Sequence, residues 1–102
     1  MTEITSTAGF TNFTRNGLVV VDFGATWCGP CRTMKPTLIR AASALGVKLG
    51  LVDVDQCEQL ASKYRISSLP TLMIFKDGNP IKTHTGTMNE QQLRAWLEQN
   101  GK

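Results

Sequence analysis

The sequence lacks any long apolar stretch. None of its runs approaches the roughly 20 apolar residues that a transmembrane helix needs. The opening residues 1–5 also lack the basic and apolar regions of a secretory signal peptide. We therefore expect a protein with no membrane partner and a cytoplasmic location. With 102 residues, 41% of them hydrophobic, the chain is long enough for one domain with its own core, spanning residues 1–102.

Clusters of basic residues are missing as well, although the net charge is +3. Lysine and arginine occur singly between residues 15 and 102, without interleaved aromatic residues. This spacing is unlike a nucleic-acid-binding surface, so we expect no nucleic-acid partner. The sequence shows no obvious second apolar patch that would favour self-association, and we expect a monomer.

Cysteine is scarce, and the count of three is odd, which excludes a fully paired disulfide framework. Two of the three lie in Trp27-Cys28-Gly29-Pro30-Cys31. A Cys-x-x-Cys pair beside a strand-helix-strand pattern is typical of a redox-active dithiol. The sequence therefore predicts thiol chemistry at this pair.

The two thiols are predicted to differ in role. Pro30 is favoured in a first helical turn, so Cys28 should lie just ahead of a helix N-terminus. The unpaired amides there favour negative charge and lower a thiol pKa. We expect Cys28 to be the attacking thiolate. Cys31, one turn into the helix and less exposed, would be the resolving thiol.

Hydrophobic periodicity predicts alternating strands and helices along the chain. The apolar run 18–23 has the character of a strand buried on both faces. Asp77-Gly78-Asn79 is a hairpin signal, which makes the last two strands antiparallel and the sheet mixed. A capping box at 55–58 would open a short helix. The predicted strands are 3–5, 18–23, 47–54, 71–76 and 80–85, and the predicted helices begin near residues 6, 28, 55 and 89.

This order of elements around Trp27–Cys31 resembles the thioredoxin family over essentially the whole chain. Further matching motifs are Val21-Asp22-Phe23, Pro36, Ser68-Leu69-Pro70-Thr71, Phe75-Lys76-Asp77-Gly78 and Gly86. The resemblance implies an α/β thioredoxin fold, with a mixed central five-stranded sheet flanked by four helices. It also implies a protein-disulfide reductase whose Cys28–Cys31 disulfide is re-reduced by a thioredoxin reductase. NADPH would act only through that reductase, and the chain itself has no dinucleotide-binding glycine motif and needs no bound cofactor.

Asp22 interrupts a run that should be buried. Burial disfavours an ionised carboxylate and should raise its pKa. A carboxylate that only caps the end of the strand is the alternative. The resemblance implies that Asp22 is the general base that takes the proton of Cys31.

A surface for substrates is implied by the same resemblance. Pro70 would follow a cis peptide bond and face the dithiol, where the neighbouring backbone pairs with an extended substrate chain. An ordinary trans proline, and Trp27 as a core residue, are the alternatives from sequence. The apolar surface around the dithiol would comprise Trp27, Gly29, Pro30, Leu69 and Gly86.

The residues alone leave three alternative functions open. Cys57 and His84 could complete a zinc site with the cysteine pair, although no second metal-binding motif is present. A thioredoxin-like oxidase or isomerase would use the same pair, but such members usually carry histidine where this chain has Gly29-Pro30. A non-catalytic binding subunit would not need both cysteines.

Two positions depart from the common family pattern. Gly24 stands where many members carry an aromatic residue, and Leu51 where many carry a lysine near the buried aspartate. We expect both to affect the pKa values and the potential of the site without changing the reaction.

Overall fold

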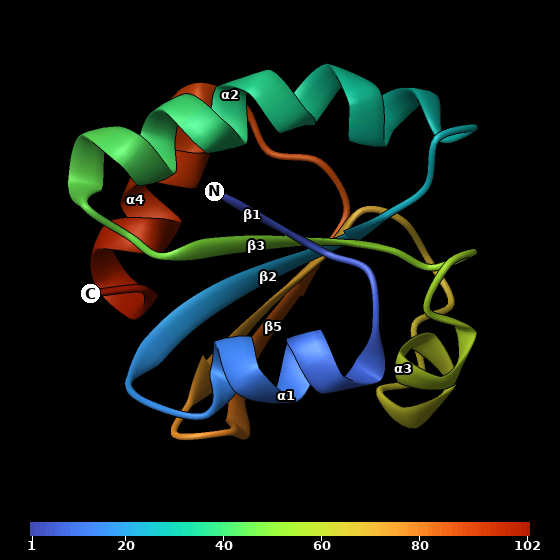
Figure 1. Cartoon of the computed structure of the whole chain (residues 1–102). Helices are drawn as coiled ribbons and strands as arrows, with labels where there is room; N and C mark the ends of the chain where they lie inside the picture. The colour runs from blue at the N-terminus through green and yellow to red at the C-terminus, as the bar shows by residue number, and fades with distance from the viewer.

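The computed structural model describes all residues, 1–102, and its elements alternate as predicted. Five strands form one mixed sheet and four helices cover it (Figure 1). This confirms the predicted fold class. In chain order the elements are β1 (Thr2–Ile4), α1 (Thr7–Thr14), β2 (Leu18–Gly24), α2 (Gly29–Leu45), β3 (Leu49–Asp53), α3 (Glu58–Lys63), β4 (Thr71–Lys76), β5 (Asn79–Thr85) and α4 (Glu90–Asn100).

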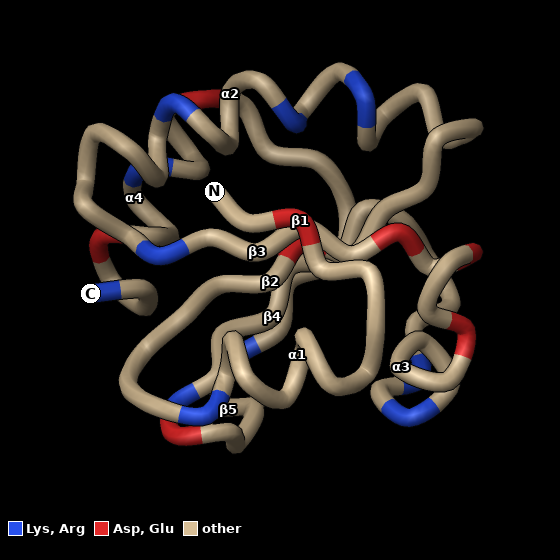
Figure 2. Tube along the Cα trace, viewed as in Figure 1, with Lys and Arg blue, Asp and Glu red and all other residues tan.

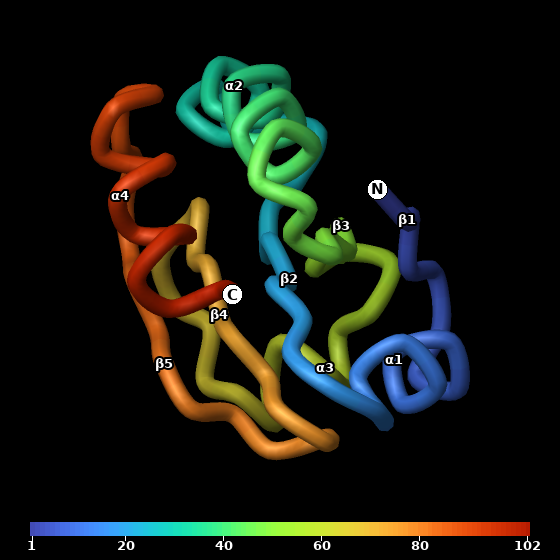
Figure 3. Tube along the Cα trace, turned by 90° about the vertical axis from the view of Figure 1, so that its left-hand side faces the viewer, coloured from blue at the N-terminus to red at the C-terminus, as the bar shows by residue number.

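The sheet has the strand order β1-β3-β2-β4-β5, which places β2 at its centre. β1, β3 and β2 run parallel, whereas β4 is antiparallel to both β2 and β5. Helices α2 and α4 cover one face of the sheet, and α1 and α3 lie on the other (Figures 1 and 3). β2 is thus buried on both faces, as its continuous apolar run predicted.

Alternation along β2 divides its side chains between two cores. Val20 packs with Leu38 of α2 and with two leucines of α4. Val21 and Phe23 pack on the opposite face, with the aromatic residues of α1. Asp22 lies between Val21 and Phe23, so its side chain points to the α2 face of the sheet.

The hairpin between β4 and β5 follows the predicted turn. Asp77 and Gly78 both have positive φ, 51° and 88°, as a two-residue loop between twisted strands requires. The Asp77 carboxylate also accepts a hydrogen bond from the Gly17 amide at 2.7 Å. This bond ties the hairpin to the loop before β2.

Two helix starts differ in how well they were predicted. At α4 the Asn89 side chain accepts from the Gln92 amide and the Gln92 side chain accepts from the Asn89 amide, a complete capping box. At α3 the predicted capping box is wrong. The helix begins at Glu58 after Cys57, which makes no side-chain capping bond. The carbonyl of Asp53 instead accepts from the amides of residues 56 and 57 and closes a turn ahead of α3.

Charged residues are spread over the elements of the fold rather than gathered in one basic cluster (Figure 2). Three ion pairs link exposed side chains, and Glu90 takes part in two of these pairs. No helix combines the length and the apolar character that crossing a membrane would require.

Candidate active site

The dithiol lies in the short connection between the central strand β2 and the start of α2. Cys28 is the N-cap residue of α2, with Pro30 in the first helical turn as predicted. Its amide donates to the carbonyl of Ala25 at 3.2 Å, and its carbonyl accepts from the amide of Arg32 at 3.1 Å. Backbone bonds on both sides therefore hold Cys28 at the N-terminal end of the helix.

Cys28 and Cys31 form a disulfide, with their Cα atoms 5.3 Å apart. The Cys28 sulfur also accepts a hydrogen bond from the Cys31 amide at 3.2 Å. That amide is one of the unpaired donors of the helix N-terminus, and it favours a thiolate on Cys28 after reduction. The geometry thus supports Cys28 as the nucleophile.

The expected difference in exposure between the two cysteines is wrong for this oxidised form. Each is 6% exposed. Both cysteines pack with Ala25 and with the half-buried Leu69. Exposure therefore does not distinguish the two cysteines here, whereas the hydrogen bond from the Cys31 amide favours negative charge on the Cys28 sulfur.

Asp22 lies inside β2 and is 6% exposed. Its Oδ1 is buried and has no hydrogen-bond partner. Burial raises the pKa of Asp22 from its ordinary 3.8 to about 7, and the positive charge of Lys35 opposes that rise. The carboxyl group can therefore gain and lose a proton near neutral pH, as general acid-base work requires.

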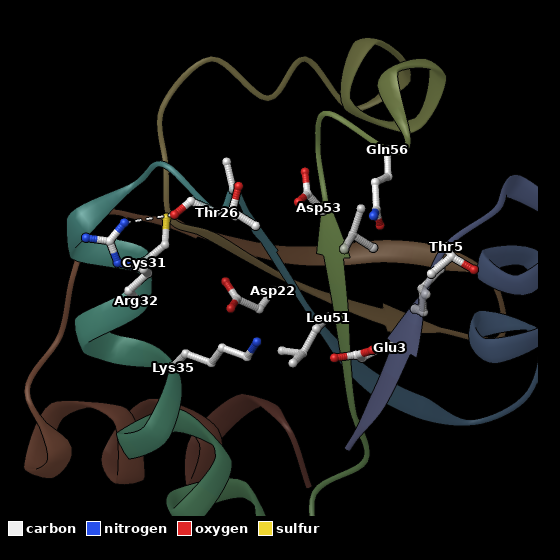
Figure 4. A pocket seen from close by; sticks show the side chains of 14 residues that line it. Glu3, Thr5, Asp22, Thr26, Cys31, Arg32, Lys35, Leu51, Asp53 and Gln56 are labelled. Atoms are coloured by element: carbon white, nitrogen blue, oxygen red, sulfur yellow. Dashed lines mark hydrogen bonds between the residues drawn. The ribbon is translucent and has the colours of Figure 1, made fainter.

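A cavity of about 350 Å³ lies between α2 and the β1 side of the sheet. Asp22 and Cys31 both line it, and Figure 4 shows the Asp22 carboxylate directed toward the start of α2. Gly24 lines the same cavity, and a Cβ at that position would lie 3.4 to 3.5 Å from the side chain of Cys31. The space behind the disulfide is thus open to a carboxylate and to solvent.

Trp27 is exposed beside the dithiol, and the interpretation of it as a core residue is wrong. The side chain is 66% exposed. Its Nε1 donates a hydrogen bond of 2.7 Å to the carboxylate of Asp55. An exposed indole fixed by its polar end offers a rigid apolar face for contact with another protein.

The remaining residues of the predicted substrate surface come from two loops and from the start of α2. The Leu69-Pro70 peptide bond is cis, and Pro70 is fully buried. The Pro70 carbonyl accepts a hydrogen bond of 2.9 Å from the amide of Gly86, which has a positive φ of 102°. Gly29 and Pro30 start α2, and Pro30 is exposed. The structure thus joins Leu69 to the cysteines and Gly86 to Pro70.

Cys57 and His84 do not join the cysteine pair. The buried Cys57 thiol donates to the Ile4 carbonyl at 3.8 Å, and burial raises the pKa of this thiol. The ring of His84, on β5, packs against Trp96 of α4, with the two ring centroids 6.1 Å apart. Nowhere in the chain do three or more His, Cys, Asp or Glu side chains gather in a way that could hold a metal ion. Cys57 and His84 therefore do not supply the two further ligands that the zinc hypothesis requires.

Sequence reasoning missed three residues near the site. Asp55 fixes Trp27, and no local signal linked these distant positions. Arg32 donates to the Thr26 carbonyl at 2.8 Å and fixes the loop ahead of the cysteines. Lys35 lines the cavity with Asp22, and its position four residues after Cys31 could have placed it on that helix face.

Comparisons with known proteins agree with this geometry. Residues 1–99 match the family model described as Thioredoxin. A thioredoxin of Chlamydia pneumoniae is 42% identical over 94 residues, covering 91% of this chain and 92% of its own. A thioredoxin of Rhodospirillum rubrum is 45% identical over 80 residues, covering 76% and 77%. The solved structure of Plasmodium falciparum thioredoxin superposes with a TM-score of 0.88 at 33% identity, covering 97% of this chain and 98% of that chain.

Proposed function

The chain belongs to the thioredoxin family, and on this premise we propose that it reduces disulfide bonds in other proteins. It is a protein-disulfide oxidoreductase that works through the dithiol of Cys28 and Cys31. The observation that carries the proposal is the bond from the Cys31 amide to the Cys28 sulfur at a helix N-terminus. It stabilises the thiolate that must attack first.

In the first step, the Cys28 thiolate attacks one sulfur of a substrate disulfide. A mixed disulfide forms between Cys28 and the substrate, and the other substrate sulfur leaves as a thiolate and takes a proton from solvent. We propose that substrates contact the accessible residues Trp27, Gly29, Pro30, Leu69 and Gly86, together with the backbone beside the buried Pro70. Backbone pairing beside Pro70 would hold the substrate as an added strand.

In the second step, Asp22 acts as a general base through the cavity. It removes the proton of Cys31, and the Cys31 thiolate attacks the sulfur of Cys28. The bond between Cys28 and the substrate breaks, and the second substrate sulfur leaves as a thiolate that takes a proton from solvent, while Asp22 returns its proton to solvent. The substrate has gained two electrons, and this chain has lost two electrons and formed the Cys28–Cys31 disulfide seen in the structure.

Return to the dithiol needs an electron donor outside this chain. We propose a thioredoxin reductase that uses NADPH as this partner, and disulfide-bonded proteins as the substrates. A dithiol that must be kept reduced suits a reducing compartment, so we also propose a cytoplasmic location. The working form is proposed to be a monomer.

The roles of the cysteines and of Asp22 are separated by single-turnover kinetics with a disulfide-bonded model protein. Cys28→Ser should abolish the reaction. Cys31→Ser should form the mixed disulfide and stop there, because the resolving thiol is absent. Asp22→Ala should form it at nearly the normal rate and resolve it at least about a hundredfold more slowly, which is the lower end of the usual contribution of a general base.

Mass spectrometry of acid-quenched samples measures the mixed disulfide at each time. Accumulation of a Cys31-linked species in Cys28→Ser would contradict the assigned order of attack. Resolution by Asp22→Ala at the normal rate at every pH would remove the role of Asp22. Retention of full function by a chain with both cysteines replaced by serine would favour a binding subunit instead.

A further inference from the structure

The electrostatic surroundings of Asp22 are unusual because its strand neighbours provide no charge. Asp22 pairs with Leu51 on β3 and with Leu72 on β4. Both leucines belong to the apolar core on the α2 face of the sheet. A charge that stabilises the ionised carboxylate must therefore come from across the cavity.

Besides Asp22, four charged side chains line that cavity: Glu3 from β1, Asp53 from the end of β3, and Arg32 and Lys35 from α2. The two carboxylates would repel an ionised Asp22. Of these, Glu3 is exposed, and the Asp53 carboxylate accepts from the Asp55 amide at 2.8 Å. The acids therefore cannot stabilise the charge of Asp22.

The two cations of α2 that line the cavity point to different places. Arg32 is bound to the carbonyl of Thr26, in the loop before the cysteines. Figure 4 shows that Lys35 extends from α2 below Asp22 toward Leu51. Lys35 is the cation whose charge acts on the Asp22 carboxyl group.

Lys35 acts without forming a close ion pair. None of the three ion pairs of the structure includes Asp22. Lys35 is exposed, so its ammonium keeps solvent contact while it faces the cavity. A direct pair would keep the carboxylate ionised and make it a weak base, whereas no cation would leave it protonated. An unpaired cation across a cavity gives an intermediate proton affinity.

We propose that Lys35 is a positioning residue for the exchange reaction. Its positive charge, placed across the cavity from Asp22, favours the ionised carboxylate and sets the pH range in which Asp22 can accept the proton of Cys31. This inference rests on the proposed role of Asp22 as general base. It also assigns to helix α2 the cation that the apolar Leu51 of β3 does not supply.

The direct test is a titration of Asp22 in the oxidised protein, followed by NMR of ¹³C-labelled aspartate carboxyl groups. In this form Cys28 and Cys31 are joined and cannot titrate, so the Asp22 signal is free of coupling to them. Lys35→Met should move the Asp22 titration upward by on the order of half a pH unit. Near pH 7 this would lower its ionised fraction roughly twofold.

Two variants serve as controls. Lys35→Arg keeps the positive charge, so Asp22 should titrate in this variant as it does in the wild type. Arg40→Met removes one positive charge from the same helix, at an exposed residue paired with Glu90, and should leave the Asp22 titration unchanged. An unchanged titration in Lys35→Met, or an equal shift in Arg40→Met, would overturn the inference.

The rate of mixed-disulfide resolution as a function of pH gives the functional measurement. In Lys35→Met the profile should move upward with the titration, whereas the rate of mixed-disulfide formation should change less. A shifted titration with an unmoved profile would overturn the role of Lys35 in the reaction. Asp22→Ala then locates the failure: an unmoved profile there rejects the base role of Asp22, and a changed one rejects Lys35 alone.

Discussion

The charge of Asp22 should cost this protein stability, and Asp22→Asn measures that cost. The asparagine has nearly the shape of the aspartate but never ionises. Folding raises the pKa of Asp22 from 3.8 to about 7. One pKa unit corresponds to about 1.4 kcal/mol, so an ionised Asp22 lowers the free energy of unfolding by about 4 kcal/mol at most.

The direction of the pH dependence follows from proton binding. Between pH 3.8 and about 7 the folded protein holds a proton on Asp22 that the unfolded chain has lost. The stability of the wild-type chain therefore falls through this range, by up to about 1.4 kcal/mol for each pH unit. Below this range Asp22 does not affect the stability. Above this range its destabilising contribution no longer changes with pH. Because domains are stable by roughly 5 to 15 kcal/mol, the effect is large.

Urea denaturation of the oxidised wild-type and Asp22→Asn proteins, at intervals from pH 4 to pH 8, provides the measurement. The variant should gain about 4 kcal/mol over the wild type across this range. Glu3→Gln is the matched control, because the exposed Glu3 lines the same cavity and loses little hydration on folding. A difference between wild type and Asp22→Asn that does not change with pH would refute the reasoning.

Two further predictions concern the fold. Gly50→Ala should lower the free energy of unfolding by about 1 to 3 kcal/mol, because the added Cβ would lie 2.7 Å from Ile4 and 2.8 Å from Phe13 in the packed core. Gly29→Ala, where nothing lies within 4 Å of the new Cβ, is the control in the same denaturation experiment, and an equal loss there would contradict the packing argument. Asn89→Ala should cost about 1 kcal/mol through loss of the α4 cap, and unchanged stability would show that the capping box contributes nothing.

The strands and most helices could be predicted because their signals are local. The apolar run of β2, the turn at Asp77-Gly78 and the cap at Asn89 each act within a few residues of the chain. The start of α3 was predicted wrongly for a tertiary reason. Asp55 has the right residue type to cap a helix, but its carboxylate binds the indole of Trp27, 28 positions away in the chain.

The candidate site shows the same division. The dithiol and the proline of the first helical turn could be predicted from the residue types and spacing of 28–31. The buried carboxylate could be predicted because Asp22 interrupts an apolar run. The equal burial of Cys28 and Cys31 could not be predicted, because it depends on the disulfide and on Leu69 from a distant loop. The sequence showed only that Leu51, at the neighbouring strand position, supplies no positive charge to Asp22. The cation that faces Asp22 is Lys35, and its place relative to Asp22 could not be predicted because it depends on the packing of α2 over the sheet.

The reduction potential of the Cys28–Cys31 couple tests the central claim most directly. The protein is equilibrated in buffers of graded dithiol ratio, quenched with acid and alkylated, and its free thiols are counted by mass spectrometry. Because Cys57 is a free cysteine, the oxidised protein gives one thiol and the reduced protein gives three. A protein-disulfide reductant should have a two-electron midpoint below the glutathione poise of extracted cytosol, about −220 to −260 mV. A midpoint well above this range would contradict the account and indicate an oxidase or isomerase.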